Sequence, residues 1–225
     1  MDDDARLRSL AARVRTADVV DAMGRFHRHR CHLTDLRSPT PERQLFGPAV
    51  TISYLPSCRQ NMPTDQYNFA DLFSEAIRDK GPGHVLVLAS NGYPDTSLCG
   101  KAKLSLVGAH GLAGILADGR LRDFAELAEF DFAAYCRGEA VRWGGDVVTP
   151  FEANRPVMVS GVLVRPGDYV FADAAGAAVI PAPEVLAVLE EAVNVVNEED
   201  SFVEMNLPTR NDGEPRSRPG EQAAR

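Results

Sequence analysis

The sequence contains few cysteines, and they are scattered. Four thiols occur in 225 residues, and no two stand at the CxxC spacing that thiolate metal sites use. The wide separation of the four cysteines also indicates no disulfide framework. We therefore expect no zinc site, and reduced thiols in a cytoplasmic protein are the simplest interpretation of Cys31, Cys58, Cys99 and Cys136.

Long apolar segments and basic runs are also missing. No apolar stretch approaches the roughly 20 residues that span a bilayer, and the start, "MDDDARLRSLAARVR", has no signal-peptide core. The chain carries 24 Lys and Arg against 32 Asp and Glu, a net charge of -8. An acidic chain of this kind is poorly suited to binding the phosphate backbone of a nucleic acid. We expect neither a membrane partner nor a direct nucleic-acid ligand.

The composition that is present supports one folded domain. With 44% hydrophobic and 25% charged residues, the chain can bury a substantial core, and no linker or internal repeat divides it. We predict a single α/β domain over residues 1–207. Residues 208–225 lack apolar anchors and are predicted to be a disordered tail.

Helical and strand patterns alternate through the first part of the chain. Thr16 is a predicted N-cap and Gly24 a predicted helix stop. From about residue 147 the pattern becomes β-rich, like an antiparallel meander, and a long helix with Pro183 near its start follows. The earlier predicted helices lie within 5–24, 64–80 and 98–110, and the predicted strands within 46–55, 84–90 and 112–118.

The stretch "LADGRLRDFAEL" places Arg122 and Asp123 between a strand and a helix. On one interpretation Asp123 caps the following helix and Glu126 completes a capping box, with Arg122 solvated. On the other, the pair lies where ligand sites of α/β sheets occur, beyond the carboxyl end of a strand. There Arg122 could bind a carboxylate and Asp123 a hard divalent cation. Both interpretations can hold for one residue.

The same stretch resembles the glycine-rich strand and DG-x-x-RD segment of the RraA-like family. Other pieces follow in family order: "TADVVDAMG", "FGPAVTI", "GPGHVLVL" and "VSGVLVRPGDYVFADAAGAAVIP". Together they span about residues 16–205. This family includes 4-hydroxy-4-methyl-2-oxoglutarate/4-carboxy-4-hydroxy-2-oxoadipate aldolases.

The resemblance implies a three-layer β/β/α sandwich of the RraA-like swivelling-domain type with mixed sheets, assembled as homotrimers or homohexamers. It further implies a lyase that cleaves or decarboxylates small anionic 2-oxo acids with Mg²⁺ or Mn²⁺. By position, Arg122 would bind the pyruvyl carboxylate and Asp123 the metal. A metal on the keto oxygen would stabilise the pyruvate enolate that cleavage leaves.

One family segment is altered. The aldolases carry G-D/E-L-L, where this chain has Gly100, Lys101, Ala102 and Lys103, and the resemblance places these residues against the substrate. Lys101 is a surface residue on one interpretation. On the other its ammonium is catalytic: it could protonate the enolate, bind an extra carboxylate, or pair with Asp123 and displace the metal. A Schiff base would require a depressed amine pKa.

The family also places a glutamate of the last helix in a neighbouring subunit's site, where it acts on the metal through water. Glu198 and Glu199 are the candidates, and alignment by Phe202 favours Glu199; a solvated acidic face is the alternative.

Other polar residues carry weaker signals. Asn91 and Asp95 are candidates to line the pocket, and Asp168 is interpreted as a turn residue. The histidines of "FHRHRCH" (His27, His29 and His32) fit no ligand set and are predicted to lie in a polar or substrate-facing loop.

These features favour a metal-assisted lyase on a small 2-oxo acid. A non-catalytic protein-binding regulator is the alternative, because the family's namesake inhibits ribonuclease E by protein contact. A repurposed biosynthetic enzyme, with chemistry altered by Lys101, is a third possibility. Retention of Arg122 and Asp123 favours chemistry.

Overall fold

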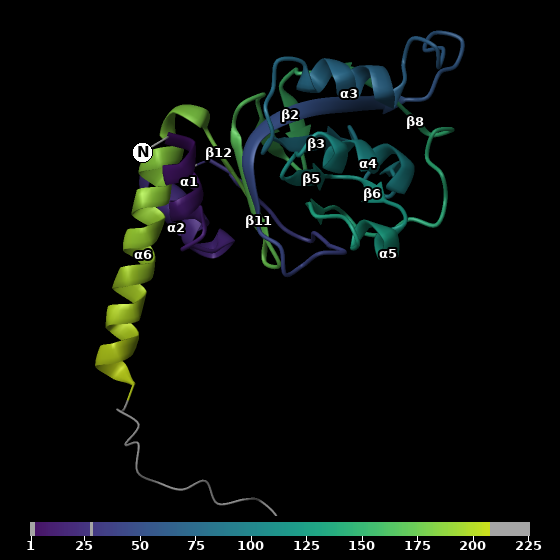
Figure 1. The fold of residues 1–225 in the computed structure, drawn as a ribbon. Coiled ribbons are helices and arrows are strands. Elements are labelled where there is room, and N and C mark those ends of the chain that lie inside the picture. Colours follow the sequence, from purple (N-terminus) through teal and green to yellow (C-terminus); the bar gives the residue numbers. More distant parts are fainter. Residues whose placement is uncertain (1–2, 28, 208–225) are drawn as a thin grey trace, which may run out of the picture.

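An eight-stranded mixed sheet organises the computed structural model, which describes residues 3–27 and 29–207 (Figure 1). The predicted tail at 208–225 lies outside these residues. Strand order is β1-β12-β11-β2-β3-β5-β7, with β8 also paired to β2. The strands are β1 (His32–Leu33), β2 (Leu45–Pro56), β3 (Val85–Ala89), β5 (Gly114–Ala117), β7 (Ala133–Tyr135), β8 (Val148–Ala153), β11 (Tyr169–Asp173) and β12 (Gly176–Ile180).

Strand β2 joins the parallel and antiparallel parts of this sheet. Residues 49–53 pair in parallel with β3, which continues through β5 to β7. Residues 45–48 pair antiparallel with β11, and residues 52–56 pair antiparallel with β8. One long strand therefore supports both the part of the chain that resembles an α/β protein and the β-rich second half. The predicted α/β class with a mixed sheet is confirmed.

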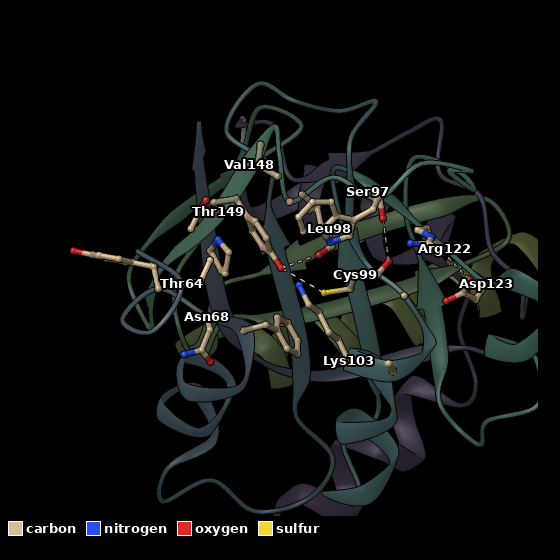
Figure 2. A pocket seen from close by; sticks show the side chains of 18 of the residues that line it. Thr64, Asn68, Ser97, Leu98, Cys99, Lys103, Arg122, Asp123, Val148 and Thr149 are labelled. Atoms are coloured by element: carbon tan, nitrogen blue, oxygen red, sulfur yellow. Dashed lines mark hydrogen bonds and ion pairs between the residues drawn. The ribbon is translucent and has the colours of Figure 1, made fainter. Parts of the chain in front are cut away.

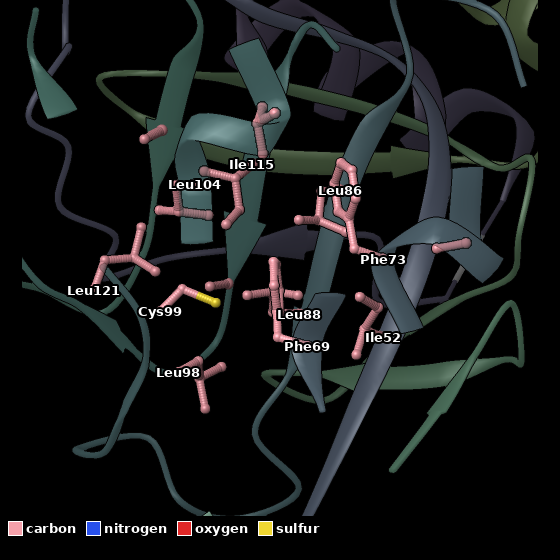
Figure 3. Close-up of a cluster of buried hydrophobic side chains, with 14 of the residues drawn as sticks. Ile52, Phe69, Phe73, Leu86, Leu88, Leu98, Cys99, Leu104, Ile115 and Leu121 are labelled. Carbon is pink, nitrogen blue, oxygen red and sulfur yellow. The ribbon is translucent and has the colours of Figure 1, made fainter. Parts of the chain in front are cut away.

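Alternation along the central strands gives the sheet two apolar faces. Leu86, Leu88 and Ile115 point toward α3 (Phe69–Ile77), α4 (Lys101–Ala109) and α5 (Phe124–Leu127), where they pack in one cluster (Figure 3). Val85 and Val87 point the other way. There they meet β11, β12 and the hairpin of β9 (Val157–Val159) and β10 (Val162–Val164).

The helices from the two ends of the chain form a further layer. α1 (Asp3–Ala11), α2 (Thr16–Phe26) and α6 (Val185–Asn206) pack on the outer face of β11 and β12, on the side opposite to α3–α5 (Figure 1). A short 3-10 helix, Ala182–Glu184, contains Pro183 and leads into α6. No helix in residues 3–27 and 29–207 combines the length and apolarity that a membrane crossing requires.

Two predicted features of α2 are wrong. Arg15, not Thr16, occupies the N-cap position, and Thr16 donates its backbone N–H to the buried Asp173 of β11 at 2.9 Å. Gly24 does not stop the helix, which continues to Phe26. The partner of the Thr16 N–H comes from a distant segment, which local sequence signals do not reveal. The later end of the helix is a shift of two residues, which is common at helix ends.

The helix predicted over 98–110 also begins later. Residues Ser97–Cys99 form β4, which pairs in parallel with β6 (Arg120–Leu121) in a separate two-stranded sheet. The apolar Leu98 and Cys99 are each 3% exposed there, so a strand buries them as effectively as a helix would. This small sheet ends beside the first turn of α4 and next to Arg122.

We predict that Gly114→Ala destabilises the fold. Gly114 has φ 154°, and an added Cβ would collide with the carbonyl oxygen of Ala133 and approach Leu45 Cδ1 to 2.8 Å. The expected loss is about 2–4 kcal/mol in the free energy of unfolding, measured by urea denaturation. Gly24→Ala is the matched control: this helical site is open, and the change should stabilise by about 0.5–1 kcal/mol. Equal stability of the two variants would contradict the prediction.

Candidate active site

A cavity of about 390 Å³ opens beside the start of α4 (Figure 2). Its walls come from the loop before α3, the first residues of α3 and α4, strands β4 and β8, and the segment that follows β6. Arg122 and Asp123 lie at one side of this cavity in Figure 2, and Thr64 and Asn68 at the other. The structure therefore brings the predicted Arg-Asp pair to a concave site.

Asp123 does not cap its own helix. It precedes α5, but its backbone is left-handed (φ 65°, ψ 46°) and its carboxylate makes no capping bond to α5. Instead Glu139 Oε1 accepts the N–H of Phe124 at 2.9 Å. The predicted capping box of Asp123 and Glu126 is thus wrong, because a cap normally requires an extended backbone at the N-cap residue.

The carboxylate of Asp123 caps a different helix. Its Oδ2 accepts the backbone N–H of Lys101 at 2.9 Å, at the positive end of α4. Gly100 permits this contact, since a Cβ at that position would stand 2.6 Å from the same oxygen. The glycine is therefore required by close approach, and Asp123 is fixed at the entrance of α4.

Arg122 is anchored through its backbone and leaves its side chain accessible. Its N–H donates to the carbonyl of Cys99 at 2.9 Å, which extends the pairing of β6 with β4. The guanidinium lies 3.9 Å from Asp123 Oδ1, and the side chain of Arg122 is 36% exposed. Within the described ranges it makes no hydrogen bond. A planar guanidinium that is held beside a cavity without a close partner is suited to binding a carboxylate.

Residues 100–103, which differ from the family's G-D/E-L-L segment, divide between the solvent and the cavity. Lys101 is exposed, its side chain does not line the cavity, and it forms no ion pair with Asp123 among the described residues. Ala102 lines the cavity, and its N–H has no acceptor in the described part of the chain. Lys103 also lines the cavity, with Nζ 5.4 Å from the centroid of the Phe69 ring. Of the two lysines, Lys103 is the one that reaches the site.

The floor of the cavity is hydrogen-bonded and unreactive. The hydroxyl of Tyr54 donates to the carbonyl of Leu98 at 3.1 Å and lies 3.4 Å from the sulfur of Cys99. Burial raises the pKa of the Cys99 thiol to about 11. The thiol is therefore protonated at neutral pH and is a poor nucleophile.

Sequence reasoning did not identify the aromatic residues of the cavity. Tyr54, Tyr67, Phe69 and Trp143 all line it, from three separate places in the chain. No short motif contains them, because only the tertiary fold brings their segments together. The "DQYNFADLF" stretch showed Phe69 as one residue of a helix pattern, with no sign that the start of this helix borders a cavity.

The structure places the weaker candidates elsewhere. Asn91 donates to the carbonyl of Tyr54 at 2.7 Å, and Asp95 pairs with Arg120 at 2.8 Å; neither lines the cavity. The suggestion that they line it is wrong, because the loop that carries them folds toward neighbouring surface hollows. Asp168 accepts the backbone N–H of Arg165 at 2.9 Å, which confirms a turn role.

The histidines behave as polar loop and strand residues. His27 bonds to Glu184, and its ring lies 5.0 Å from that of His29, while His32 begins β1. In the described residues, no three His, Cys, Asp or Glu side chains group closely enough to hold a metal.

The two glutamates of α6 differ in their contacts. Glu198 pairs with Arg25 of α2 at 2.7 Å. Glu199 is exposed, on the part of α6 that extends away from the sheet (Figure 1). Since α6 and the cavity lie on opposite sides of the chain, Glu199 does not line the cavity of its own subunit.

The donor set at the cavity suits a hydrated hard cation. Asp123 is the one carboxylate among the lining residues, and its Oδ1 accepts no hydrogen bond within the described ranges. Mg²⁺ commonly keeps several waters and binds proteins through one or two carboxylates. A single carboxylate is compatible with a largely hydrated Mg²⁺ or Mn²⁺, whereas it would not complete a zinc site.

Known proteins resemble this chain in sequence. Protein DlpA of Legionella pneumophila is 29% identical over 180 residues, which cover 80% of this chain; the match spans 28% of DlpA's length. A Paraburkholderia phytofirmans protein named "Putative 4-hydroxy-4-methyl-2-oxoglutarate aldolase" is 32% identical over 167 residues, covering 74% of this chain and 96% of that protein.

A solved structure shares both the fold and part of the sequence. Streptomyces coelicolor RraAS2, described as an unusual member of the RNase ES inhibitor RraA protein family, superposes with a TM-score of 0.76 at 27% identity. The match covers 89% of this chain and 97% of RraAS2. The family model for RraA-like proteins (Aldolase/RraA) matches residues 16–179, and the chain therefore belongs to the RraA-like family.

Proposed function

We propose that the chain is a carbon–carbon lyase for a small anionic 2-oxo acid, acting by retro-aldol cleavage or by decarboxylation of the oxaloacetate type. One observation carries the proposal: Arg122 and Asp123 stand together at the entrance of α4, in one cavity, and the guanidinium makes only a long ion-pair contact of 3.9 Å with Asp123, which leaves its N–H donors available to a ligand. The aldolase name of the Paraburkholderia phytofirmans relative supports it.

Arg122 binds and orients the substrate in this proposal. Two parallel hydrogen bonds from the guanidinium hold the carboxylate beside the keto group and so align the bond that breaks. The unpartnered N–H of Ala102 and the positive end of α4 favour negative charge at the same place.

The chemistry leaves an enolate of pyruvate in either reaction. In retro-aldol cleavage the C3–C4 bond breaks, and its electron pair stays on the pyruvyl half. The 4-hydroxyl loses its proton as C4 becomes a carbonyl, and a proton returns to C3. Mg²⁺ or Mn²⁺ bound at Asp123 would supply Lewis-acid stabilisation of the keto oxygen. The backbone N–H of Lys101 holds Asp123 in place for this role.

A protein-binding regulator is the second candidate. The likeness to RraAS2, described within an RNase ES inhibitor family, favours it, and so does the loss of the family acid at Lys101. A regulator has no need of a free guanidinium and a carboxylate inside a cavity, which is why we prefer the lyase.

Pyruvate release tests the choice. The protein should release pyruvate from oxaloacetate or from 4-hydroxy-4-methyl-2-oxoglutarate with Mg²⁺ or Mn²⁺, and EDTA should abolish the release. No pyruvate from either substrate under all these conditions would overturn the lyase and leave the regulator.

Arg122→Lys should be a severe change. An ammonium lacks the planar fork, so we expect a loss of about 2–4 kcal/mol in transition-state stabilisation, read as kcat/KM for pyruvate release. Arg13→Lys, on an exposed site between α1 and α2, is the control and should match the parent. Unchanged kcat/KM in Arg122→Lys would return this residue to a solvated surface role.

Asp123→Asn separates the two roles of Asp123. An amide oxygen can still accept the N–H of Lys101, and Asn tolerates the left-handed backbone, so the urea midpoint should hardly move. Metal binding by calorimetry and metal-dependent activity should both be lost, because a neutral amide is a poor ligand for a hard cation. Asp123→Ala should lose stability as well. Full metal affinity in Asp123→Asn would show that Asp123 is only a cap.

We also propose a trimer or hexamer, in which Glu199 reaches the neighbouring subunit's cavity. Phe202 and Met205, on the same end of α6, are 64% and 76% exposed in the single chain, which favours a covering subunit. Light scattering should give a mass of three or six chains. Glu199→Gln should lower metal-dependent activity about 10- to 100-fold. Glu204→Gln serves as the control on this helix, and a stable monomer at micromolar concentration would exclude the arrangement.

A further inference from the structure

The cavity extends well beyond the groups that the proposed reaction uses. Arg122, Asp123 and the first turn of α4 occupy one side, and Thr64 and Asn68 mark the other, with Cys99 and Lys103 between them (Figure 2). A volume of about 390 Å³ lies within the range of sites for drug-sized ligands. Pyruvate and its close relatives would fill only part of it, so the far half has room for the rest of a larger substrate.

Two aromatic rings in that far half are held in fixed positions. Tyr67 stacks on Phe151 with the ring centroids 5.7 Å apart and the planes 4° from parallel. Phe69 is 3% exposed and stacks on Phe73 at 5.8 Å. Both lining rings belong to the same short segment at the start of α3, beside Asn68. A pre-formed aromatic wall is suited to another flat apolar group, which it can meet in an offset or edge-on contact.

The ammonium of Lys103, which lies between the two sides of the cavity, also suits a ring. The ammonium of Lys103 lies 5.4 Å from the centroid of Phe69 and forms no ion pair among the described residues. A second π face from a ligand would add to this cation–π contact. A carboxylate would meet the same lysine but would have to shed its hydration against aromatic walls. The surroundings of Lys103 therefore favour the ring.

Trp143 extends the aromatic surface to the rim. It is 54% exposed and lines both this cavity and an adjacent hollow. Large exposed apolar side chains are common, but a tryptophan that borders a cavity can cover an apolar ligand when it binds.

We propose that the substrate carries an aromatic group at C4: a 4-aryl-4-hydroxy-2-oxobutanoate whose carboxylate meets Arg122 and whose ring lies between Tyr67, Phe69 and Lys103. The inference rests on the proposed lyase function. The C3–C4 bond breaks with its electron pair left on C3, the hydroxyl proton departs as C4 becomes the carbonyl of an aromatic aldehyde, and a proton added to C3 completes pyruvate. No oxidant or co-substrate is needed.

Substrate preference tests the proposal. Pyruvate release with Mg²⁺ is compared for 4-hydroxy-2-oxo-4-phenylbutanoate and 4-hydroxy-4-methyl-2-oxoglutarate. The phenyl compound should have a kcat/KM about 10-fold or more higher, the ratio expected when a ring finds an apolar site. Preference for 4-hydroxy-4-methyl-2-oxoglutarate, a dicarboxylate, by a similar factor would overturn the proposal. It would indicate that Lys103 binds the second carboxylate, and it would leave the proposed lyase function standing.

Variants locate the preference. The preference is the kcat/KM for 4-hydroxy-2-oxo-4-phenylbutanoate divided by the kcat/KM for 4-hydroxy-4-methyl-2-oxoglutarate. Tyr67→Leu and Phe69→Leu should each reduce this ratio about 10-fold. Tyr67 is only half-buried, so its variant remains informative if the buried Phe69 variant fails to fold. Phe130→Leu replaces a ring that does not line the cavity and should keep the parent ratio. An unchanged ratio in a folded Tyr67→Leu would contradict the assignment.

A binding measurement separates this inference from the function on which it rests. 2-Oxo-4-phenylbutanoate shares the oxo-acid group with pyruvate and carries a ring on C4, as the proposed substrate does, but it lacks the 4-hydroxyl and cannot be cleaved. Calorimetry with Mg²⁺ therefore reports the aromatic subsite without turnover. 2-Oxo-4-phenylbutanoate should bind about 10-fold tighter than pyruvate, and Tyr67→Leu should remove the difference. Tighter binding of 2-oxo-4-phenylbutanoate without pyruvate release from any substrate would support the subsite and reject the lyase. Equal binding with 4-hydroxy-4-methyl-2-oxoglutarate cleavage would reject the subsite and support the lyase. Equal binding without cleavage would reject both.

Discussion

The hydrogen bond from the backbone of Lys101 to the carboxylate of Asp123 is the contact on which the cavity depends. It joins the start of α4 to the segment that follows β6, and α4, β5 and β6 lie between these two places in the chain. Gly100 leaves room for it, and the pairing of β4 with β6 brings the segments close. With this bond in place, Arg122, the first turn of α4 and the floor around Cys99 all face one space.

The pattern of apolar residues in the sequence was enough to predict the central strands of the sheet. Residues 85–89 and 114–117 lie inside the predicted runs 84–90 and 112–118, because a strand buried on both faces needs an unbroken apolar sequence. Helix ends were less predictable. Asp123 and Glu126 satisfied every local rule for a capping box, yet Glu139 performs the capping and Asp123 serves another helix. Local rules cannot reveal a partner from a different segment.

The candidate site was predictable only in part, for similar reasons. Arg122 and Asp123 are neighbours in the sequence, so one motif contained both. Lys101 and Lys103 are two positions apart on a helix, which turns them to different sides, and only the orientation of α4 decides that Lys103 lines the cavity. The aromatic wall has no motif, since the segment before α3 meets β8 only in the folded chain.

The double pairing of β2 has a consequence for biosynthesis. Strand β2 leaves the ribosome early, and β3 can pair with it soon afterwards, but β8 and β11 occupy its other edge and are made much later. A nascent chain that ends before residue 148 therefore carries an open strand edge and lacks the cavity wall at Thr149 and Pro150. The active site is complete only when the C-terminal half has been synthesised. An incomplete translation product therefore lacks an active site and is prone to aggregate.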